Sequence, residues 1–209
     1  MRFGWHTFAA CFLLLVSSLS VGAMEPVVEF QSFTFPPKDG EPQFERKYLL
    51  YLPKTLKTNA PLLFVLHGYR GDARDYMGEM GMNVQADKHG FAVCYPQGSD
   101  DAEGVPHWNA RLRISQTDDV AFLARLALAL QNKHGLNPNK TFVCGVSNGG
   151  FMSYTLVAEK PSVFKAAASV IGTMSGTTWE NRETCKAVPI LQMTGMYDEV
   201  VPHDGSMST

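Results

Sequence analysis

The sequence TFVCGVSNGGFMSYTLVAEK, residues 141–160, decides which fold this chain can adopt. An apolar run leads into a glycine, a serine and two further glycines, and a helical pattern begins at once. A strand that turns directly into a helix strains the residue at the corner, and flanking glycines remove side chains that would collide there. Gly145, Ser147 and Gly149 therefore predict a serine held on a sharp strand-to-helix turn.

Such a corner presents the Ser147 hydroxyl at the N-terminus of a helix. Backbone N–H groups and the helix dipole favour negative charge at that point, as acyl transfer requires. The pattern G-x-S-x-G is short, and its alternative is a glycine-rich turn with an idle serine. The apolar strand before it and the periodic helix after it favour a nucleophile. A phosphate-binding loop is disfavoured, because the Lys-Ser/Thr pair of a P-loop and the spacing of a dinucleotide fingerprint are absent.

The rest of the chain alternates apolar strands with helices. Such alternation predicts an α/β fold with a mostly parallel, doubly wound sheet, helices on both faces, and chemistry at the carboxyl ends of the strands. Asp72 is expected to cap one helix that Gly90 ends, and Thr117 or Asp118 to cap another. The predicted strands are 44–53, 61–68, 91–96, 140–147, 165–172 and 188–195, and the predicted helices are 72–89, 117–135 and 148–160.

The composition fits one globular domain. The chain has 209 residues, of which 45% are hydrophobic, and a formal net charge of −2. With no block of like charge, nothing indicates nucleic acid or an anionic membrane surface as a partner. The sequence does not indicate an oligomeric state.

The first 23 residues differ from the rest. Arg2 precedes an apolar run from Phe8 to Val16, and Val21 and Ala23 occupy the −3 and −1 positions of a cleavage site. The run is about half of the ~20 residues that span a bilayer. It predicts a secretory signal peptide, residues 1–23, cut near Ala23. The mature domain would be 24–209, secreted and without an integral membrane segment; the alternative is an uncut anchor.

Three cysteines remain after that cleavage. Export implies an oxidising compartment. Cys94, Cys144 and Cys185 are odd in number, so at least one is free or bonds to a group outside this chain. Their spacing matches no zinc pattern, and no metal or organic cofactor is predicted.

A series of ordered motifs carries a family resemblance. The chain resembles the α/β-hydrolase superfamily, and more narrowly the secreted esterases that include polyhydroxybutyrate depolymerases and feruloyl and acetylxylan esterases, the carbohydrate esterase family 1-like group. The likeness covers about Val27 to Gly205, and the ordered set is more specific than any one motif. The motifs are LHGYRGDARDY (66–76), HGFAVCYPQG (89–98), HWNA (107–110), TDDVAFL (117–123), GVSNGGFMSY (145–154) and GMYDEVVPHDG (195–205).

The resemblance assigns roles around the serine corner. Ser147 is the expected nucleophile, and the backbone N–H groups of Asn148 and Tyr69 are the expected oxyanion-hole donors. His67 is not expected to be the base, because the triad in this fold runs serine, acid, histidine in chain order. In similar enzymes this His-Gly pair shapes the loop.

Asp198 matches the acid that orients the histidine and stabilises the imidazolium. Glu199 or Asp204 are alternatives, as is a solvated loop role for Asp198. Trp108 and Asn109 are expected either to line a substrate cleft or to anchor their loop on the core.

The paired carboxylates Asp118 and Asp119 lie where a helix begins. They are interpreted as caps and as partners of the helix dipole rather than as catalytic groups.

The histidine that would act as the base of the triad is not identified by the sequence. Only His203 follows Asp198, five residues on, and His107 would break the expected chain order. The resemblance implies a further helix, a last strand and a histidine loop after Thr209. The expectation is therefore a fold that lacks its last strand and helix. Residues 188–195 would then form an unpaired edge with apolar surface in water.

The sequence thus predicts a secreted serine esterase that forms an acyl-enzyme. Its substrates would be hydroxyalkanoate or other short-chain esters, or ester groups on a polysaccharide. Two alternatives stay open: a serine peptidase on the same fold, and an impaired hydrolase or binding module without the triad histidine.

Overall fold

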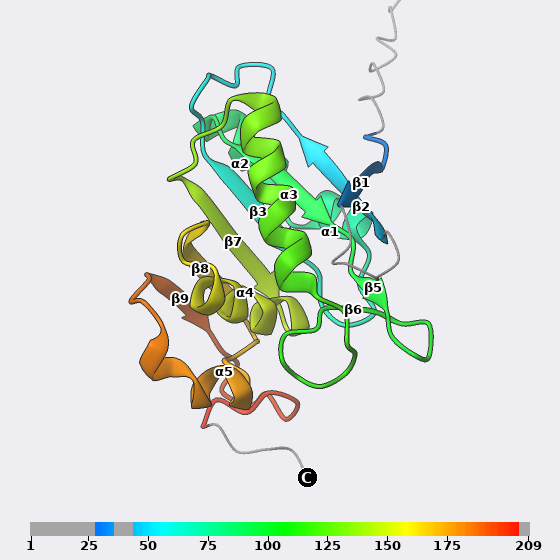
Figure 1. Cartoon of the computed structure of the whole chain (residues 1–209), viewed down its shortest axis with the longest axis vertical. Helices are drawn as coiled ribbons and strands as arrows, with labels where there is room; N and C mark the ends of the chain where they lie inside the picture. The colour runs from blue at the N-terminus through cyan, green and yellow to red at the C-terminus, as the bar shows by residue number, and fades with distance from the viewer. Residues whose placement is uncertain (1–27, 36–43, 205–209) are drawn as a thin grey trace, which may run out of the picture.

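The computed structural model describes residues 28–35 and 44–204 (Figure 1). The predicted signal peptide lies outside these residues. The strands are β1 (Gln31–Phe35), β2 (Phe44–Tyr51), β3 (Leu62–Leu66), β4 (Ala92–Pro96), β5 (Ser99–Asp100), β6 (Pro106–His107), β7 (Thr141–Val146), β8 (Phe164–Val170) and β9 (Ile190–Met193). The helices are α1 (Ala73–Glu79), α2 (Met82–His89), α3 (Asp119–His134), α4 (Asn148–Glu159) and α5 (Gly176–Glu180), with a 3₁₀ turn, η1 (Arg182–Thr184).

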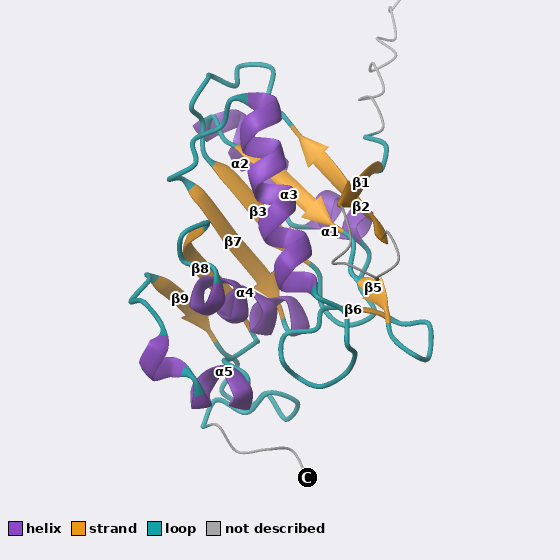
Figure 2. Cartoon of the chain, in the orientation of Figure 1, coloured by secondary structure: helices purple, strands orange, loops and turns teal. Residues whose placement is uncertain are grey.

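A seven-stranded sheet organises the fold, in the order β1-β2-β4-β3-β7-β8-β9. β1 and β2 are antiparallel to their neighbours, and β4, β3, β7, β8 and β9 run parallel. The mostly parallel sheet with helices on both faces is confirmed (Figure 2). The sequence reasoning missed β1, the small β5–β6 hairpin and α5.

The core consists of two clusters on opposite faces of the sheet. One contains Phe64 with Phe122 of α3 and Met152 of α4, and the other contains Val65 with Ala86 of α2. Successive residues of β3 are therefore buried on opposite faces, Phe64 at 0% and Val65 at 3% exposure. This explains why the central strands are continuous apolar runs rather than alternating ones.

The single helix predicted over 72–89 is wrong. The structure has α1 and α2, separated at Gly81, whose φ of 64° is left-handed and cannot continue a helix. Asp72 does cap α1 by accepting the N–H of Arg74, and Gly90 ends α2 with a φ of 72°. Both terminal signals were correct, and the internal break was missed.

The prediction that Asp118 and Asp119 are both caps is half right. Asp118 is the N-cap of α3 and accepts the N–H of Ala121 at 3.0 Å. The Asp119 carboxylate instead points into the interior, where it lies 2.7 Å from the guanidinium of Arg46 with its side chain fully buried. A buried carboxylate needs such a partner, because desolvating an isolated charge is costly.

All three cysteines of the described chain are free. Cys94 on β4 and Cys144 on β7 are separated by β3, which puts their backbones roughly 9.5 Å apart at the usual strand spacing. A disulfide cannot span that separation. Burial raises the pKa of Cys94 well above its ordinary value and that of Cys144 to about 11, so both thiols stay protonated at neutral pH.

β9 is the exposed edge of the sheet. Its pairing within the described residues is with β8 alone, and Leu191 and Met193 are 59% and 47% exposed. Among the described residues, β9 is thus an edge strand with exposed apolar side chains, while the further C-terminal elements that the resemblance implies stay a prediction. Across 28–35 and 44–204, no helix is both long and apolar enough to cross a bilayer.

Candidate active site

Ser147 occupies the predicted corner between β7 and α4. Its φ of 51° and ψ of −117° are strained values for a residue with a side chain. The corner is held because the Ser147 N–H donates to the carbonyl of Val170 at 2.8 Å, while its own carbonyl accepts the N–H of Phe151 at 3.0 Å. The half-buried serine therefore lies at the N-terminus of α4 and at the carboxyl end of β7.

The glycines around the corner permit very close backbone contacts. A Cβ at Gly149 would lie 2.5 Å from the carbonyl oxygens of both Leu66 and His67, so α4 begins directly against the end of β3. Sequence reasoning missed Gly172, where a Cβ would lie 2.6 Å from the Ser147 carbonyl oxygen. The signal that could have identified Gly172 is its position at the end of the predicted strand 165–172.

The two expected oxyanion donors lie on segments that meet at Ser147. A Cβ at Gly68 would lie 3.7 Å from the Ser147 Cβ, which brings the loop that continues into Tyr69 beside the serine. Asn148 is the first residue of α4, and the first N–H groups of a helix have no intrahelical acceptor. Backbone donors are thus available on both sides of the serine.

His67 has both ring nitrogens engaged within the loop structure. Nδ1 donates to the Gly68 carbonyl at 2.7 Å, and Nε2 accepts the N–H of Gly98 at 2.9 Å. Burial lowers the pKa of His67 below its ordinary value, with the Gly68 hydrogen bond opposing this in part. The side chain is fully buried and neutral, in keeping with a structural role rather than that of a base.

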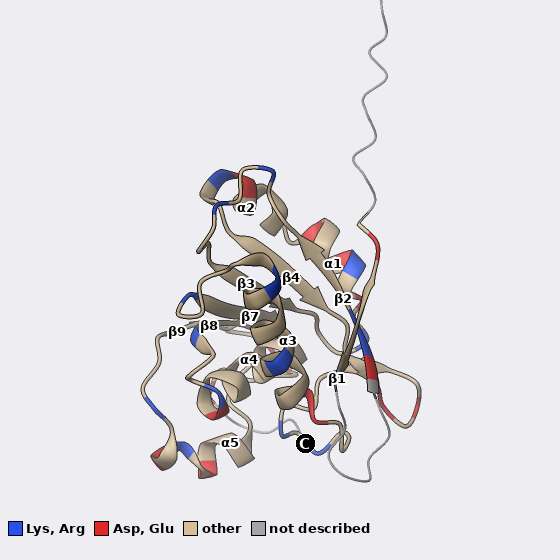
Figure 3. Ribbon diagram, turned by 45° about the horizontal axis from the view of Figure 1, so that its top comes forward, with Lys and Arg blue, Asp and Glu red and all other residues tan. Residues whose placement is uncertain are grey.

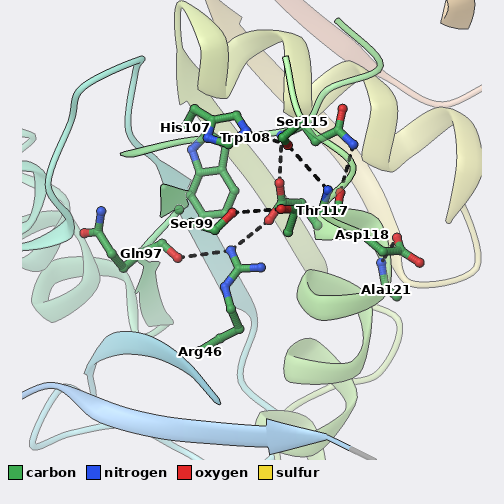
Figure 4. Close-up of polar contacts among 12 residues, drawn as sticks. Arg46, Gln97, Ser99, His107, Trp108, Ser115, Thr117, Asp118 and Ala121 are labelled. Carbon is green, nitrogen blue, oxygen red and sulfur yellow. Dashed lines mark hydrogen bonds and ion pairs between the residues drawn. The ribbon is translucent and has the colours of Figure 1, made fainter. Parts of the chain in front are cut away.

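Trp108 and Asn109 are interior residues. Trp108 is fully buried, and its indole N–H donates to the His67 carbonyl at 2.9 Å. The Asn109 side chain donates to the Thr117 carbonyl, and its backbone N–H donates to Asp119 at 2.7 Å. Figure 4 shows Trp108 above the Arg46 side chain, within this polar network. Of the two alternatives, burial supports the loop anchor and not the cleft wall.

Asp198 follows β9 at the carboxyl edge of the sheet, in the red segment of Figure 1. Its carboxylate accepts the N–H groups of Val200 and Val201 at 3.0 and 2.9 Å. These bonds order its own turn. Glu199 is exposed on the same turn.

The described residues place no histidine ring within hydrogen-bonding reach of the serine hydroxyl. Within residues 28–35 and 44–204, no histidine nitrogen is hydrogen-bonded to the Ser147 hydroxyl. His107 is buried, with Nε2 at 2.7 Å from Ser115 Oγ and Nδ1 without a partner (Figure 4). His203 lies exposed beyond Asp198.

Two surface features were not foreseen. The Tyr69 hydroxyl donates to Asp101 at 2.7 Å, a bond that raises the pKa of Tyr69 and lowers that of Asp101. An open cavity of about 460 Å³ is lined by residues that include Arg111, Glu159 and Asn181. None of the candidate catalytic residues lines this cavity.

The fold matches that of solved α/β-hydrolases. A crystal structure of a thermostable esterase superposes with a TM-score of 0.65 at 23% identity, covering 84% of this chain and 48% of the other. The acetyl xylan esterase from Aspergillus awamori superposes with a TM-score of 0.56, covering 72% of this chain and 54% of the other. The described domain is therefore an α/β-hydrolase fold.

Sequence comparison narrows this class to a family. The family model described as esterase PHB depolymerase matches residues 46–206, and the chain belongs to that family. The poly(3-hydroxyalkanoate) depolymerase C of Paucimonas lemoignei is 29% identical over 168 residues, which are 79% of this chain and 38% of the relative. The chain spans only part of its curated relatives: 38% of this depolymerase, 43% of the putative esterase NocK of Nocardia uniformis subsp. tsuyamanensis, and 60% of the feruloyl esterase B of Thermothelomyces thermophilus.

Proposed function

We propose that this protein is a secreted serine esterase that cleaves carboxylic esters through an acyl-enzyme. The observation that carries the proposal is the strained conformation of Ser147, φ 51° and ψ −117°, at the start of α4. Backbone strain persists where the surrounding structure holds it, and such residues cluster at functional sites. The membership of an esterase and depolymerase family supports the same reaction class.

The reaction would begin with attack of the Ser147 oxygen on the ester carbonyl carbon. The hydroxyl proton passes to a base, the carbonyl oxygen becomes an oxyanion facing the N–H groups of Tyr69 and Asn148, and the alcohol leaves with a proton. Water then releases the acid and regenerates the serine. Asp198 would orient the imidazole of the base and stabilise its charge.

The relatives indicate which classes of ester to test as substrates. A depolymerase of hydroxyalkanoate polymers and acetylxylan esterases match the chain, so short-chain and hydroxyalkanoate esters and polysaccharide-linked esters are the substrates to test. A serine peptidase on the same fold would use the same serine corner, and a peptide anilide substrate separates it from an esterase.

One observation favours a second candidate. Because no described histidine is hydrogen-bonded to the Ser147 hydroxyl, the second candidate is an impaired hydrolase that binds its ligand and turns over slowly. Removing the base from a triad leaves only weak residual catalysis.

Covalent labelling of the 209-residue chain with a fluorophosphonate decides between these candidates. An active esterase is labelled rapidly at one site, hydrolyses p-nitrophenyl acetate, and loses both properties in Ser147→Ala. Labelling no faster than in Ser147→Ala, with ester still bound, would establish the impaired form. Ser162→Ala, in the turn before β8, is the matched control and should leave labelling unchanged.

A further inference from the structure

The side chain of Asn148 forms a two-point bond with one residue of a distant loop. Its Oδ1 accepts the N–H of Trp108 at 2.7 Å, and its Nδ2 donates to the carbonyl of Trp108 at 3.0 Å. Both residues are buried, at 5% and 0% exposure. Two antiparallel bonds from a planar amide fix its rotation, so the residue that follows the nucleophile is tied to a loop 40 residues away in the chain.

Trp108 extends this connection to the end of β3. Its indole N–H donates to the His67 carbonyl at 2.9 Å, and its ring lies 4.9 Å from the imidazole centroid of His67. If the end of β3 shifted relative to the Trp108 loop, both of these contacts would be lost.

His67 in turn fixes the peptide group between Gly68 and Tyr69. Its Nδ1 holds the Gly68 carbonyl at 2.7 Å, and the Gly71 N–H donates to the same oxygen at 3.0 Å. A trans peptide is planar, with its C=O and N–H pointing in opposite directions. Holding the Gly68 oxygen therefore also sets the direction of the Tyr69 N–H.

We propose that the Asn148 side chain and Trp108 are positioning residues, which set the separation and aim of the two oxyanion donors, the N–H groups of Asn148 and Tyr69. One buried path, Asn148–Trp108–His67–Gly68, connects the two donors. This inference rests on the proposed function for its catalytic meaning, since donors matter only where an oxyanion forms. Donors pre-set at the right distance need no reorganisation as charge develops.

The path is supported from its outer side as well. The N–H of Asn109 donates to the buried Asp119 carboxylate at 2.7 Å, and Asp119 is paired with Arg46. The backbone at 108–109 is thus held between α4 and α3. The alternative is that these contacts serve stability alone, and the tests below separate the two roles.

The first test needs no catalysis. Backbone amide NMR spectra would be compared for the wild type, Asn148→Ala and Tyr95→Phe. The control removes a hydroxyl that donates to Asn83 at 2.9 Å on the other face of the sheet. We expect Asn148→Ala to shift the amide signal of Tyr69, and Tyr95→Phe to leave it in place. An unchanged Tyr69 amide in Asn148→Ala would overturn the coupling.

The second test uses hydrolysis of p-nitrophenyl acetate by Trp108→Phe, which keeps an aromatic ring but loses the indole donor. We expect kcat to fall about tenfold to a hundredfold with KM within about twofold, because misaligned donors weaken transition-state contacts more than ground-state binding. Tyr95→Phe should keep kcat within about twofold. Equal kcat values in the two variants would overturn the positioning role.

Failure of the proposed function gives a different result. A wild-type chain that neither hydrolyses ester nor reacts with fluorophosphonate would refute the esterase. The amide spectra would still decide whether the two N–H groups are coupled.

Discussion

The proposed nucleophile lies at the centre of the sheet and the proposed acid at its β9 edge, and the two are held by different kinds of contact. At the centre, Ser147 and Asn148 are bonded to β8 and to the 108 loop, and the glycines leave no space between α4 and β3. At the edge, the hydrogen bonds described for Asp198 all lie within its own turn: its carboxylate accepts the N–H groups of Val200 and Val201, and its N–H donates to the Gly195 carbonyl. Leu191 on the neighbouring strand is 59% exposed.

The two halves therefore depend on different parts of the sequence. The serine corner is fixed by contacts between segments far apart in the chain, so any one of them can be tested by its effect on the rest. The proposed acid, Asp198, is fixed by a local turn, so the stability of the whole domain should be insensitive to substitutions there. Four measurements test this contrast.

The largest effect is expected at Gly149. Gly149→Ala would bring a Cβ to 2.5 Å from the carbonyl oxygens of Leu66 and His67, and backbone cannot move aside as a side chain can. We expect a loss of about 3 to 5 kcal/mol in the free energy of unfolding, measured by urea denaturation. Gly176→Ala is the control, since nothing lies within 4 Å of its Cβ position. Equal stability of the two variants would mean that the corner is less tightly packed than described.

The next largest effect is expected at the buried ion pair. Asp119→Ala leaves the Arg46 guanidinium without the carboxylate that lies 2.7 Å away. We expect the free energy of unfolding to fall by about 3 kcal/mol. Adding Arg46→Met should restore part of that loss, because the unpaired charge is then gone. A double variant no more stable than Asp119→Ala would show that the pair is not the cause.

A smaller effect is expected from pH through His67. Burial lowers its pKa in the folded protein, so the unfolded chain binds a proton first as pH falls below about 6.5. The contribution that the neutral His67 makes to the free energy of unfolding is complete above about pH 6.5. It is lost as the pH falls below that value, by no more than about 1.4 kcal/mol per pH unit. His67→Asn should flatten the slope of stability against pH between 6.5 and 5, relative to the wild type. Parallel slopes would assign the pH dependence to other groups.

The smallest effect on stability is expected at Asp198. Asp198→Asn keeps an oxygen that accepts the N–H groups of Val200 and Val201, so the free energy of unfolding should change by less than about 0.5 kcal/mol. Ester hydrolysis should nevertheless fall at least about a hundredfold, because an amide stabilises an imidazolium poorly. Glu199→Gln, on the same exposed turn, is the control. A fall in Glu199→Gln instead would move the acid to that residue.

Much of the fold was predictable because its signals are local. Strands buried on both faces gave continuous apolar runs, and the glycines around Ser147 marked the corner. The break at Gly81 was missed because one glycine inside a helical pattern does not by itself show a left-handed conformation.

The parts of the site that were not predicted depend on contacts between distant segments. Nothing in the neighbourhood of Asp119 indicates that its partner is Arg46, 73 residues earlier, and its place at a helix start favoured a cap. For Trp108 the residue type alone allowed both a cleft wall and an anchor. Only its complete burial separates them.

The β9 edge also has a consequence for the protein in solution. Ile190–Met193 carries no charged side chain (Figure 3), and among the described residues no strand pairs with its outer row of N–H and C=O groups. Edge strands of stable monomers usually carry lysine, proline or a bulge that prevents such pairing. The described part of the chain therefore presents a template with which a strand from outside it can pair.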